Sequence, residues 1–472
     1  MPEPDLPVVL LSHRGPVTFA AGPDGGRTAT RGAGGLVTAL TGLMSHLDDA
    51  VWVCVVSGGE DADRVLRLRL MEVPEEVHQP FYGVVANPLL WFVQHRLYGL
   101  GVAPVLGREE HAAWNDGYVR ANELAADGVA QEVERAGGRA AVFLHDYHFY
   151  LVGDLVRQRC PDVLLSHFVH IPWPAPDSWR VLPPVMRERI LTGLLGCDVV
   201  AFHTRTDARN FLLCVLELLG LPVDLEAMSV AVGSRTVRVR AYPISIDVAS
   251  LEEIAGGDDA GQHLADLSSQ LGDAQLVLRV DRTDPSKNIV RGFLAFDLLL
   301  TEHPELAGSV VFLALLQPSR QDVPEYATYL AEIGAAATSV NAKHGTGSWQ
   351  PVDLRLAQEM PLAAAAYRRC DVLVVNAVAD GMNLVAKEAV VVNERDMVLA
   401  LSEATGAHDE LGRFAVTLHP FDVAQQADAL FHALTMPEAE RRERRQLAAG
   451  VVRHNDVSRW LDAQLQDMAR LA

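Results

Sequence analysis

The chain has 472 residues, 49% of them hydrophobic, and its 40 basic and 61 acidic residues give a formal net charge of −21. This length allows two or three domains with large cores, and the apolar content excludes a disordered chain. The charge argues against a general nucleic-acid binder or a protein that binds anionic membranes, because both need a basic surface.

The cysteines and the apolar runs indicate a cytoplasmic protein. The five cysteines are scattered and mostly lie inside apolar runs, which predicts buried thiols and neither a disulfide framework nor a zinc site. The amino-terminal residues lack the basic segment of a signal peptide. No apolar run is long enough to cross a membrane, which takes about 20 residues.

Short β-branched runs alternate with longer helical patterns along the whole chain. The runs are 8–12, 51–56, 140–145, 163–170 and 199–203 in the first half, and 276–280, 310–316, 371–375, 397–401 and 414–418 in the second. This alternation predicts an α/β fold in which parallel sheets are covered by helices on both faces. Since a typical sheet holds about 4–6 strands, we expect two doubly wound, Rossmann-like domains facing each other across a crevice.

A segment rich in Asp, Gly and Ser, 249–273, follows the strand-like run 237–246 and suggests a domain junction near Asp247. We therefore predict a first domain over 1–247 and a second over 248–450. The terminal segment 451–472 is expected to contain the last helix, at about 457–471, which could pack back on the first domain.

Two loops of the first domain contain residues that suit ligand binding. Gly34 and Gly35 follow the first strand, where glycines let the backbone approach a phosphate or a sugar closely. Their spacing is not that of a dinucleotide-binding GxGxxG motif, and an ordinary turn is the alternative. After the second run, Asp61 and Asp63 resemble a DxD metal motif, but they lie in a Gly- and Asp-rich turn that we interpret as a surface loop.

Histidines end two further strands of this domain, in His145-Asp146-Tyr147-His148 and in His170-Ile171-Pro172-Trp173-Pro174. Histidine pairs can bind a metal ion. However, no third ligand stands at a suitable spacing, and an HExxH motif is absent. We predict a protein without a metal site and without another cofactor.

The second domain has a candidate diphosphate site. Arg282 and Lys287 follow the run 276–280 and flank a turn that contains proline. An arginine fork and a lysine point charge can together bind a diphosphate. For this segment alone, a solvated charged loop is the alternative.

The segment 380–388, Asp-Gly-Met-Asn-Leu-Val-Ala-Lys-Glu, is the most informative of the chain. It follows a buried run and leads into a helix, so Asp380 lies at a strand-to-helix turn and Glu388 about two helical turns further on. Unpaired backbone N–H groups at a helix start suit an anion, and a carboxylate can accept hydrogen bonds from sugar hydroxyls. The alternative is an ordinary turn with a capping Asp.

Together these motifs resemble those of the trehalose-6-phosphate synthase family, which are retaining glucosyltransferases of the two-Rossmann GT-B architecture. The resemblance covers nearly the whole chain, from Ser12 to Asp422. It implies transfer of glucose from a nucleoside-diphosphate glucose to glucose 6-phosphate, giving α,α-trehalose 6-phosphate. It also implies a metal-independent reaction without an enzymic nucleophile, and a homo-oligomer is compatible with the sequence.

The resemblance further implies roles for individual residues. The acceptor phosphate is expected at Arg14, Tyr82, Trp91 and Arg320, with the acceptor sugar at Asp146. The donor is expected under a loop with Gly34 and Gly35, beside His170, with its diphosphate at Arg282 and Lys287. The hydroxyls of the donor sugar are expected at Asp380, and the ribose at the side chain of Glu388. The sugar and phosphates are expected along the backbone of Met382, Asn383, Leu384 and Val385, and the base at the backbone near Gln358. Asp146, His170, Arg282, Lys287 and Asp380 are the predicted catalytic residues.

Two departures from the family pattern bear on the substrate. His13 stands where the family often has Asn, and the run 283–288 resembles that of actinobacterial pseudo-glycosyltransferases with GDP-linked donors. We therefore expect GDP-glucose to be preferred over UDP-glucose. The alternatives are a pseudo-glycosyltransferase that couples a GDP-cyclitol to an aminocyclitol phosphate, and a catalytically silent regulator that binds sugar phosphates.

Overall fold

The structure is a computed structural model that describes residues 6–21, 27–31, 37, 40–41, 44, 50–56, 68–99, 101–356 and 359–471. It divides into two compact units: unit 1 comprises residues 1–244 and 458–472, and unit 2 comprises residues 245–457. The junction predicted near Asp247 lies close to the observed boundary between Ile244 and Ser245.

Unit 1 is built on a sheet with the strand order β5-β4-β1-β6-β7-β8-β11-β10-β9. Its strands from β5 to β11 pair in parallel, and β10 and β9 add an antiparallel edge. The strands are β1 Val8–Ser12, β4 Ala50–Val56, β5 Leu68–Glu72, β6 Ala141–His145, β7 Leu164–Phe168, β8 Val199–Phe202, β9 Val223–Asp224, β10 Ser229–Val232 and β11 Arg235–Ala241, with a separate hairpin of β2 Val17–Ala21 and β3 Arg27–Arg31.

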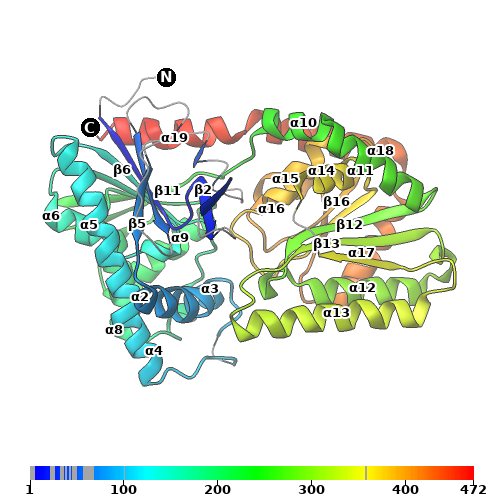
Figure 1. The fold of residues 1–472 in the computed structure, drawn as a ribbon, viewed down its shortest axis with the longest axis horizontal. Coiled ribbons are helices and arrows are strands. Elements are labelled where there is room, and N and C mark those ends of the chain that lie inside the picture. The colour runs from blue at the N-terminus through cyan, green and yellow to red at the C-terminus, as the bar shows by residue number, and fades with distance from the viewer. Residues whose placement is uncertain are drawn as a thin grey trace. The chain divides into compact units, whose positions relative to one another are not determined.

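Helices connect the parallel strands of unit 1, as Figure 1 shows. They are α2 Glu75–Pro80, η2 Phe81–Leu90, α3 Trp91–Gln94, α4 Arg108–Ala112, η3 Ala113–Val119, α5 Arg120–Arg135, η4 Tyr147–Phe149, α6 Val152–Arg159, α7 Pro176–Trp179, α8 Pro184–Leu195, α9 Arg205–Cys214 and η5 Val215–Leu219.

Unit 2 contains a fully parallel sheet with the order β14-β13-β12-β15-β16-β17. Its strands are β12 Gln275–Arg282, β13 Val310–Gln317, β14 Val352–Leu356, β15 Val372–Val375, β16 Val398–Ser402 and β17 Val416–Leu418. The helices are α10 Val248–Gly256, α11 Asp258–Leu271, η6 Pro285–Lys287, α12 Ile289–Glu302, η7 Pro304–Leu306, α13 Pro324–His344, α14 Met360–Arg369, α15 Leu384–Val392, α16 Ala407–Leu411, η8 Gly412–Phe414, α17 Val423–Thr435 and α18 Glu438–His454.

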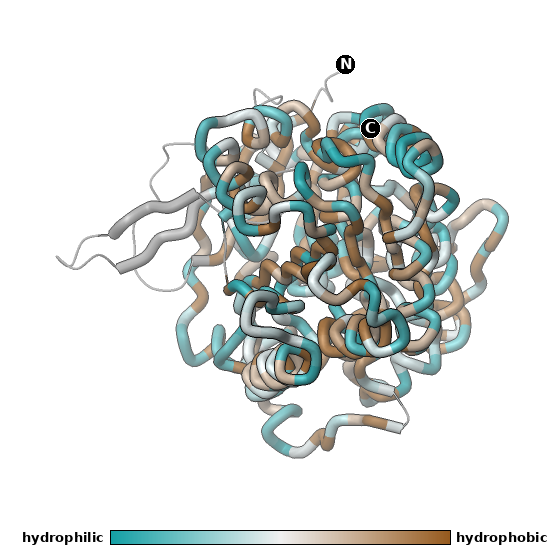
Figure 2. The backbone as a smooth tube through the Cα atoms, turned by 90° about the vertical axis from the view of Figure 1, so that its right-hand side faces the viewer, coloured by the Kyte–Doolittle hydropathy of each residue, from teal (hydrophilic) through white to brown (hydrophobic). Residues whose placement is uncertain are grey.

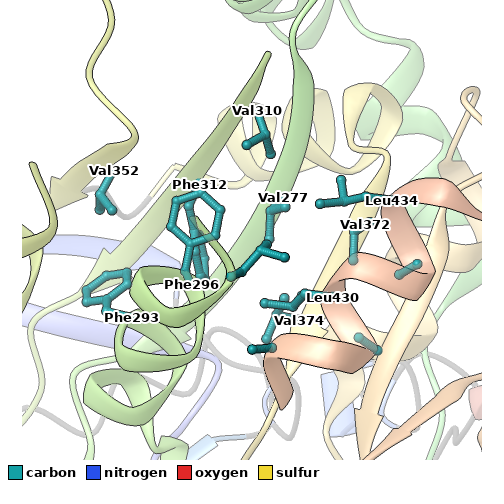
Figure 3. Close-up of a cluster of buried hydrophobic side chains, with 14 of the residues drawn as sticks. Val277, Phe293, Phe296, Val310, Phe312, Val352, Val372, Val374, Leu430 and Leu434 are labelled. Carbon is teal, nitrogen blue, oxygen red and sulfur yellow. The ribbon is translucent and has the colours of Figure 1, made fainter. Parts of the chain in front are cut away.

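The sheet of unit 2 lies between two helical layers, with α12, α13 and α17 on one face and α10, α11, α14 and α15 on the other (Figure 1). Figure 3 shows the core under the first layer, where Phe293 and Phe296 of α12 meet the ring of Phe312 on β13. Their ring centroids lie 5.3 and 5.2 Å from that of Phe312, both edge-on. Figure 2 shows hydrophobic residues along the inner segments and hydrophilic residues on outer helix turns.

The terminal helix forms close to the residues predicted for it, about 457–471. The helix α18 ends at His454 in unit 2, and α19 Val457–Ala469 lies almost wholly in unit 1. Oδ2 of Asp467 accepts hydrogen bonds from the Tyr242 hydroxyl at 2.6 Å and from Nε of Arg240 at 3.2 Å, so α19 is held on β11.

Both sheets reverse their strand order at one point, between β1 and β6 in unit 1 and between β12 and β15 in unit 2. Ligands of doubly wound folds bind at the carboxyl ends of strands at such a point. The motifs after these strands are therefore well placed for binding. None of the helices that the structure describes combines the length and apolar character of a membrane span.

Candidate active site

In unit 2 a short, firmly held turn follows β12. The carboxylate of Asp284 accepts a hydrogen bond from the backbone N–H of Ser286 at 2.9 Å and thereby begins η6. Asn288 adopts a left-handed conformation, with φ 60°, between η6 and α12. Its side-chain amide donates to the carbonyl oxygens of Asn376 at 2.9 Å and Pro420 at 2.6 Å. These contacts fix the position of Lys287, which lies between Asp284 and Asn288.

The structure brings the predicted diphosphate lysine and the predicted sugar carboxylate together. The ammonium group of Lys287 donates a hydrogen bond to Oδ2 of Asp380, and the side-chain amide of Asn383 donates to the same oxygen at 3.1 Å. The side chains of Lys287 and Asp380 are 13% and 14% exposed. Arg282, the last residue of β12, is partly buried at the same end of the sheet. The sequence prediction therefore identified residues that share one location.

A second carboxylate, which the sequence prediction missed, lies near this pair. Asp281 has its Oδ2 3.3 Å from Nη1 of Arg279, and Arg279 is fully buried. Burial raises the pKa of Asp281 to about 6, although the cations of Arg279 and Lys287 act in the opposite direction. Burial would lower the pKa of Lys287, but Asp380 and Asp281 outweigh it and the pKa is raised. Lys287 is thus firmly cationic, as a diphosphate ligand should be.

A strand-to-helix turn forms at 380–383 as predicted, but α15 begins only at Leu384, so Glu388 lies one helical turn into the helix and not two. Asn383 has φ 79°, and its side-chain oxygen accepts a hydrogen bond from the backbone N–H of Ala386 at 3.1 Å, which begins α15. One turn into the helix, Oε2 of Glu388 accepts a hydrogen bond from the Tyr367 hydroxyl at 2.9 Å. Burial raises the pKa of Glu388, partly offset by this bond. Lys387 has a structural role, because it is 1% exposed and its Nζ lies 2.6 Å from Oε2 of Glu410.

In unit 1 the predicted acceptor acid and the predicted donor histidine are neighbours. Asp146 follows β6 with φ 71° and ψ 174°, and its backbone N–H donates to the carbonyl of Phe168 at 2.8 Å. Its Oδ1 accepts a hydrogen bond from the backbone N–H of His170 at 3.3 Å. The main-chain strain at Asp146 is therefore held by contacts to the end of β7.

The imidazole of His170 belongs to a cluster of buried histidines. Its Nε2 lies 3.1 Å from Nδ1 of His145, and its ring stacks on Phe168 with centroids 4.5 Å apart. Burial lowers the pKa of His170 well below its usual range, and the nearby His203, His145 and His167 add to the effect. Burial likewise lowers the pKa of His145 to about 3. Both rings are neutral at pH 7 and act as hydrogen-bonding groups rather than cations.

Tyr82, a predicted acceptor residue, belongs to a stack of rings with His13, which follows β1, and His148, which lies in η4 after β6. The His13 ring is nearly parallel to Tyr82, with centroids 5.0 Å apart, and to His148, with centroids 4.4 Å apart. Arg14 is exposed beside this stack. His13 entered the sequence prediction only as a departure from the family, and its place in the stack was not foreseen.

Two other predicted acceptor residues have clear packing roles. Trp91 is 5% exposed, and its ring stacks on His95 at 4.0 Å and meets Tyr147 edge-on at 5.6 Å. Arg320 belongs to unit 2, where its guanidinium lies 3.3 Å from Oδ2 of Asp284 and bonds to the Tyr326 hydroxyl. Contact with a phosphate remains a prediction for both.

The remaining predicted residues, Gly34, Gly35 and Gln358, lie outside the described residues, as do Asp61 and Asp63. Within the described ranges, no group of three or more His, Cys, Asp or Glu side chains is arranged to hold a metal ion. The five cysteines are free thiols, and four of them are buried.

The model of glycosyltransferase family 20 matches residues 8–470 of the chain. The trehalose-6-phosphate synthase of Mycobacterium tuberculosis (strain ATCC 25618 / H37Rv) is 33% identical over 489 residues, covering 98% of this chain and 95% of the relative. The alpha,alpha-trehalose-phosphate synthase (UDP-forming) of Pichia angusta is 30% identical, covering 98% and 99%. The bifunctional trehalose-6-phosphate synthase/phosphatase of Thermoproteus tenax is 35% identical, and the match spans 96% of this chain but only 62% of that longer relative.

Solved structures resemble the chain over its full length. The E. coli protein bound with UDP-2-fluoro glucose is 28% identical with a TM-score of 0.86, covering 98% of this chain and 99% of that one. An alpha,alpha-trehalose-phosphate synthase (UDP-forming) from Burkholderia xenovorans, in complex with glucose-6-phosphate, is 26% identical with a TM-score of 0.85, at the same coverage.

Proposed function

The chain belongs to glycosyltransferase family 20, the trehalose-6-phosphate synthase family, and we propose that it transfers glucose from a nucleoside-diphosphate glucose to glucose 6-phosphate. The product is α,α-trehalose 6-phosphate, formed with retention at the donor carbon. The observation that carries this proposal is the contact between Lys287 and Asp380 beside the strand-order reversal of unit 2. It joins a cation suited to a diphosphate with an acid suited to sugar hydroxyls.

Most of the proposed donor residues belong to unit 2. Arg282 and Lys287 neutralise the diphosphate as it leaves, which stabilises the transition state. Asp380 accepts hydrogen bonds from hydroxyls of the glucose, and the backbone at 382–385 approaches the sugar and phosphates. Glu388, held by the Tyr367 hydroxyl, accepts bonds from the ribose.

Most of the proposed acceptor residues belong to unit 1, and Arg320 of unit 2 is a further proposed ligand of the phosphate. Arg14 binds the 6-phosphate, close to the ring stack of His13, Tyr82 and His148. Asp146 accepts a hydrogen bond from the acceptor sugar. The neutral imidazole of His170, one backbone contact away, bonds to the donor glucose.

The proposed transfer takes place on one face of the donor sugar. The bond between the anomeric carbon and the diphosphate oxygen breaks, and a bond to the anomeric oxygen of glucose 6-phosphate forms on the same side. The acceptor hydroxyl proton passes to the leaving phosphate oxygen. The enzyme contributes by positioning the two sugars and stabilising the leaving charge, and no metal ion or other cofactor is required.

Two lines of support disagree about the donor base. The run 283–288 favours GDP-glucose, whereas relatives are named UDP-forming and the E. coli structure contains a UDP sugar. The base contacts expected near Gln358 lie outside the described residues. The GDP-glucose preference is therefore a prediction that depends on the sequence, chiefly on the 283–288 run.

The deciding experiment is a panel of donors and acceptors with identification of the product. GDP-, UDP- and ADP-glucose are each offered with glucose 6-phosphate, and kcat/KM is compared. We expect trehalose 6-phosphate as the product. A GDP-cyclitol is also offered with an aminocyclitol phosphate, and transfer in that combination alone would support the pseudo-glycosyltransferase. Absence of transfer in every combination would support the silent regulator. A clear preference for UDP-glucose would refute the GDP-glucose prediction and leave the synthase proposal in place.

A further inference from the structure

A small cavity lies in unit 1 between β6 and α19, the terminal helix drawn in red in Figure 1. The water-accessible volume of the cavity is about 10 Å³, which is enough for one water molecule. Leu40, Phe143 and Leu465 form an apolar part of its wall. The cavity is therefore small and largely apolar, and any polar group that lines it needs a hydrogen-bond partner.

Three polar residues complete the wall, and each has a buried atom without a hydrogen-bond partner among the residues that the structure describes. These atoms are Nε2 of His145, Nε1 of Trp460 and Oε1 of Gln464. The three residues are only 2%, 3% and 4% exposed. A buried polar group without a partner destabilises the fold, so three such groups on residues that line one cavity call for a common partner.

The orientation of the Gln464 amide is fixed by its own helix. Its Nε2 donates a hydrogen bond to the carbonyl oxygen of Trp460 at 3.3 Å. Because that carbonyl can only accept, the amide nitrogen must face it, and Oε1 is the atom left for another donor. The three lining residues thus offer one certain donor, the indole N–H of Trp460, and one certain acceptor, Oε1 of Gln464. The third group, Nε2 of His145, can donate or accept.

We propose that one water molecule in this cavity bridges His145, Trp460 and Gln464, and that it thereby sets which ring nitrogen of His170 carries the proton. The connection to His170 is direct, because Nδ1 of His145 lies 3.1 Å from its Nε2. The water site stands on the structure alone. Only its consequence for catalysis rests on the proposed function, which places His170 at the donor sugar.

Counting donors selects one arrangement of protons. The water accepts from the Trp460 indole and has two hydrogens to give. If it donates to Gln464 and to Nε2 of His145, every donor has an acceptor and only a lone pair of the water is left over. If His145 instead donates to the water, one water hydrogen has no acceptor among the described residues that line the cavity. The first arrangement is favoured, since an unmet donor is more costly than an unused lone pair.

In this arrangement Nδ1 of His145 carries the proton and donates to Nε2 of His170. His170 is neutral, so its own proton is on Nδ1, which becomes a donor to an oxygen of the substrate. The opposite tautomer would present a lone pair and require the sugar to donate. Trp460 and Gln464 of α19 are therefore positioning residues that act on His170 through a water molecule and His145.

The test compares Gln464→Met and Trp460→Phe with the matched control Gln466→Met, two residues further along α19 on an exposed position. A high-resolution crystal structure shows whether a water contacts the three atoms.

Nitrogen NMR of histidine-labelled protein, assigned with His145→Asn and His170→Asn, reports the proton position on each ring. We expect a bound water, a proton on Nδ1 of His145, and altered His170 signals in both cavity variants. We also expect kcat to fall about 2- to 10-fold with each KM within about twofold, and no change in the control.

A dry cavity, a proton on Nε2 of His145, or His170 signals that stay unchanged in both variants would each overturn the proposal. The crystallographic and NMR measurements need no turnover. A wild-type protein without transferase activity would refute the proposed function, but those measurements would still decide the water site.

Discussion

The ammonium group of Lys287 donates a hydrogen bond to the carboxylate of Asp380, which is 93 residues away in the sequence. The two residues follow β12 and β15, the adjacent strands at which the sheet of unit 2 reverses its order. In the proposed reaction one binds the diphosphate and the other binds the glucose. The ion pair therefore links the recognition of the leaving group to the recognition of the transferred sugar.

The first prediction concerns the two cations of this site. We expect Lys287→Ala and Arg282→Ala each to lower kcat by about 100-fold or more, because a contact to the leaving group is worth a few kcal/mol in the transition state. Steady-state kinetics with saturating donor and acceptor measure the effect. A thermal melt of each variant shows whether the fold persists, since Lys287→Ala also leaves the Asp380 carboxylate without its ammonium partner.

The matched control is Lys343→Ala. Lys343 is 50% exposed on α13, where it pairs with Asp297. Its loss should leave kcat unchanged and cost at most about 1 kcal/mol of stability. Near-normal turnover in both Lys287→Ala and Arg282→Ala would refute the assignment of these residues to the diphosphate.

Much of the fold could be predicted from the sequence because buried parallel strands form continuous apolar runs. Each strand of the two predicted series is present, within two residues at either end. The strands that were missed are short or polar, such as β3 with the sequence Arg-Thr-Ala-Thr-Arg and the edge strand β14 with Val-Asp-Leu-Arg-Leu. Such sequences lack the apolar signal of a strand that is buried on both faces.

The site was predictable only where a motif places its residues at a strand end. Lys287, Asp380, Asp146 and His170 were found in this way. The ion pair of Arg320 with Asp284, and the cavity between β6 and α19, depend on contacts between residues far apart in the chain. A single sequence contains no signal for such pairs, because neither their spacing nor their residue types are unusual.

A second prediction follows from the raised pKa of Asp281, which is about 6 in the folded protein. An unfolded Asp has a pKa of about 3.9, so between these values the native state binds the proton more tightly than the unfolded state. The free energy of unfolding should therefore fall as the pH rises from about 4 to about 6, and no further loss should come from this group above that range. From the two pKa values, the fall between pH 5 and pH 7.5 is about 1 kcal/mol.

Equilibrium urea unfolding of the wild type and Asp281→Asn at both pH values isolates this contribution, since Asn does not titrate. Relative to the variant, the wild type should be more stable at pH 5 than at pH 7.5 by about that amount. Parallel pH profiles for the two proteins would show that Asp281 has an ordinary pKa.

A third prediction is that the transfer does not require a metal ion. The diphosphate is expected to be neutralised by Arg282, Lys287 and backbone N–H groups, which replace the divalent cation used by many transferases. After dialysis against EDTA, the initial rate should match that of the untreated enzyme. A loss of rate that added Mg²⁺ or Mn²⁺ restores would show that a cation takes part.

The last prediction separates the acceptor site from the donor site. Arg14 is exposed next to the ring stack of His13 and Tyr82 in unit 1, and we expect it to bind the phosphate of glucose 6-phosphate. A charge-assisted hydrogen bond contributes about 1.5–3 kcal/mol, so Arg14→Ala should raise the KM for glucose 6-phosphate by roughly 10- to 150-fold. The KM for the donor should stay within about twofold, because no donor contact is assigned to Arg14. Arg209→Ala, at an exposed position of α9 in the same unit, should leave both constants unchanged. Equal increases in both KM values for Arg14→Ala would contradict a role confined to the acceptor phosphate.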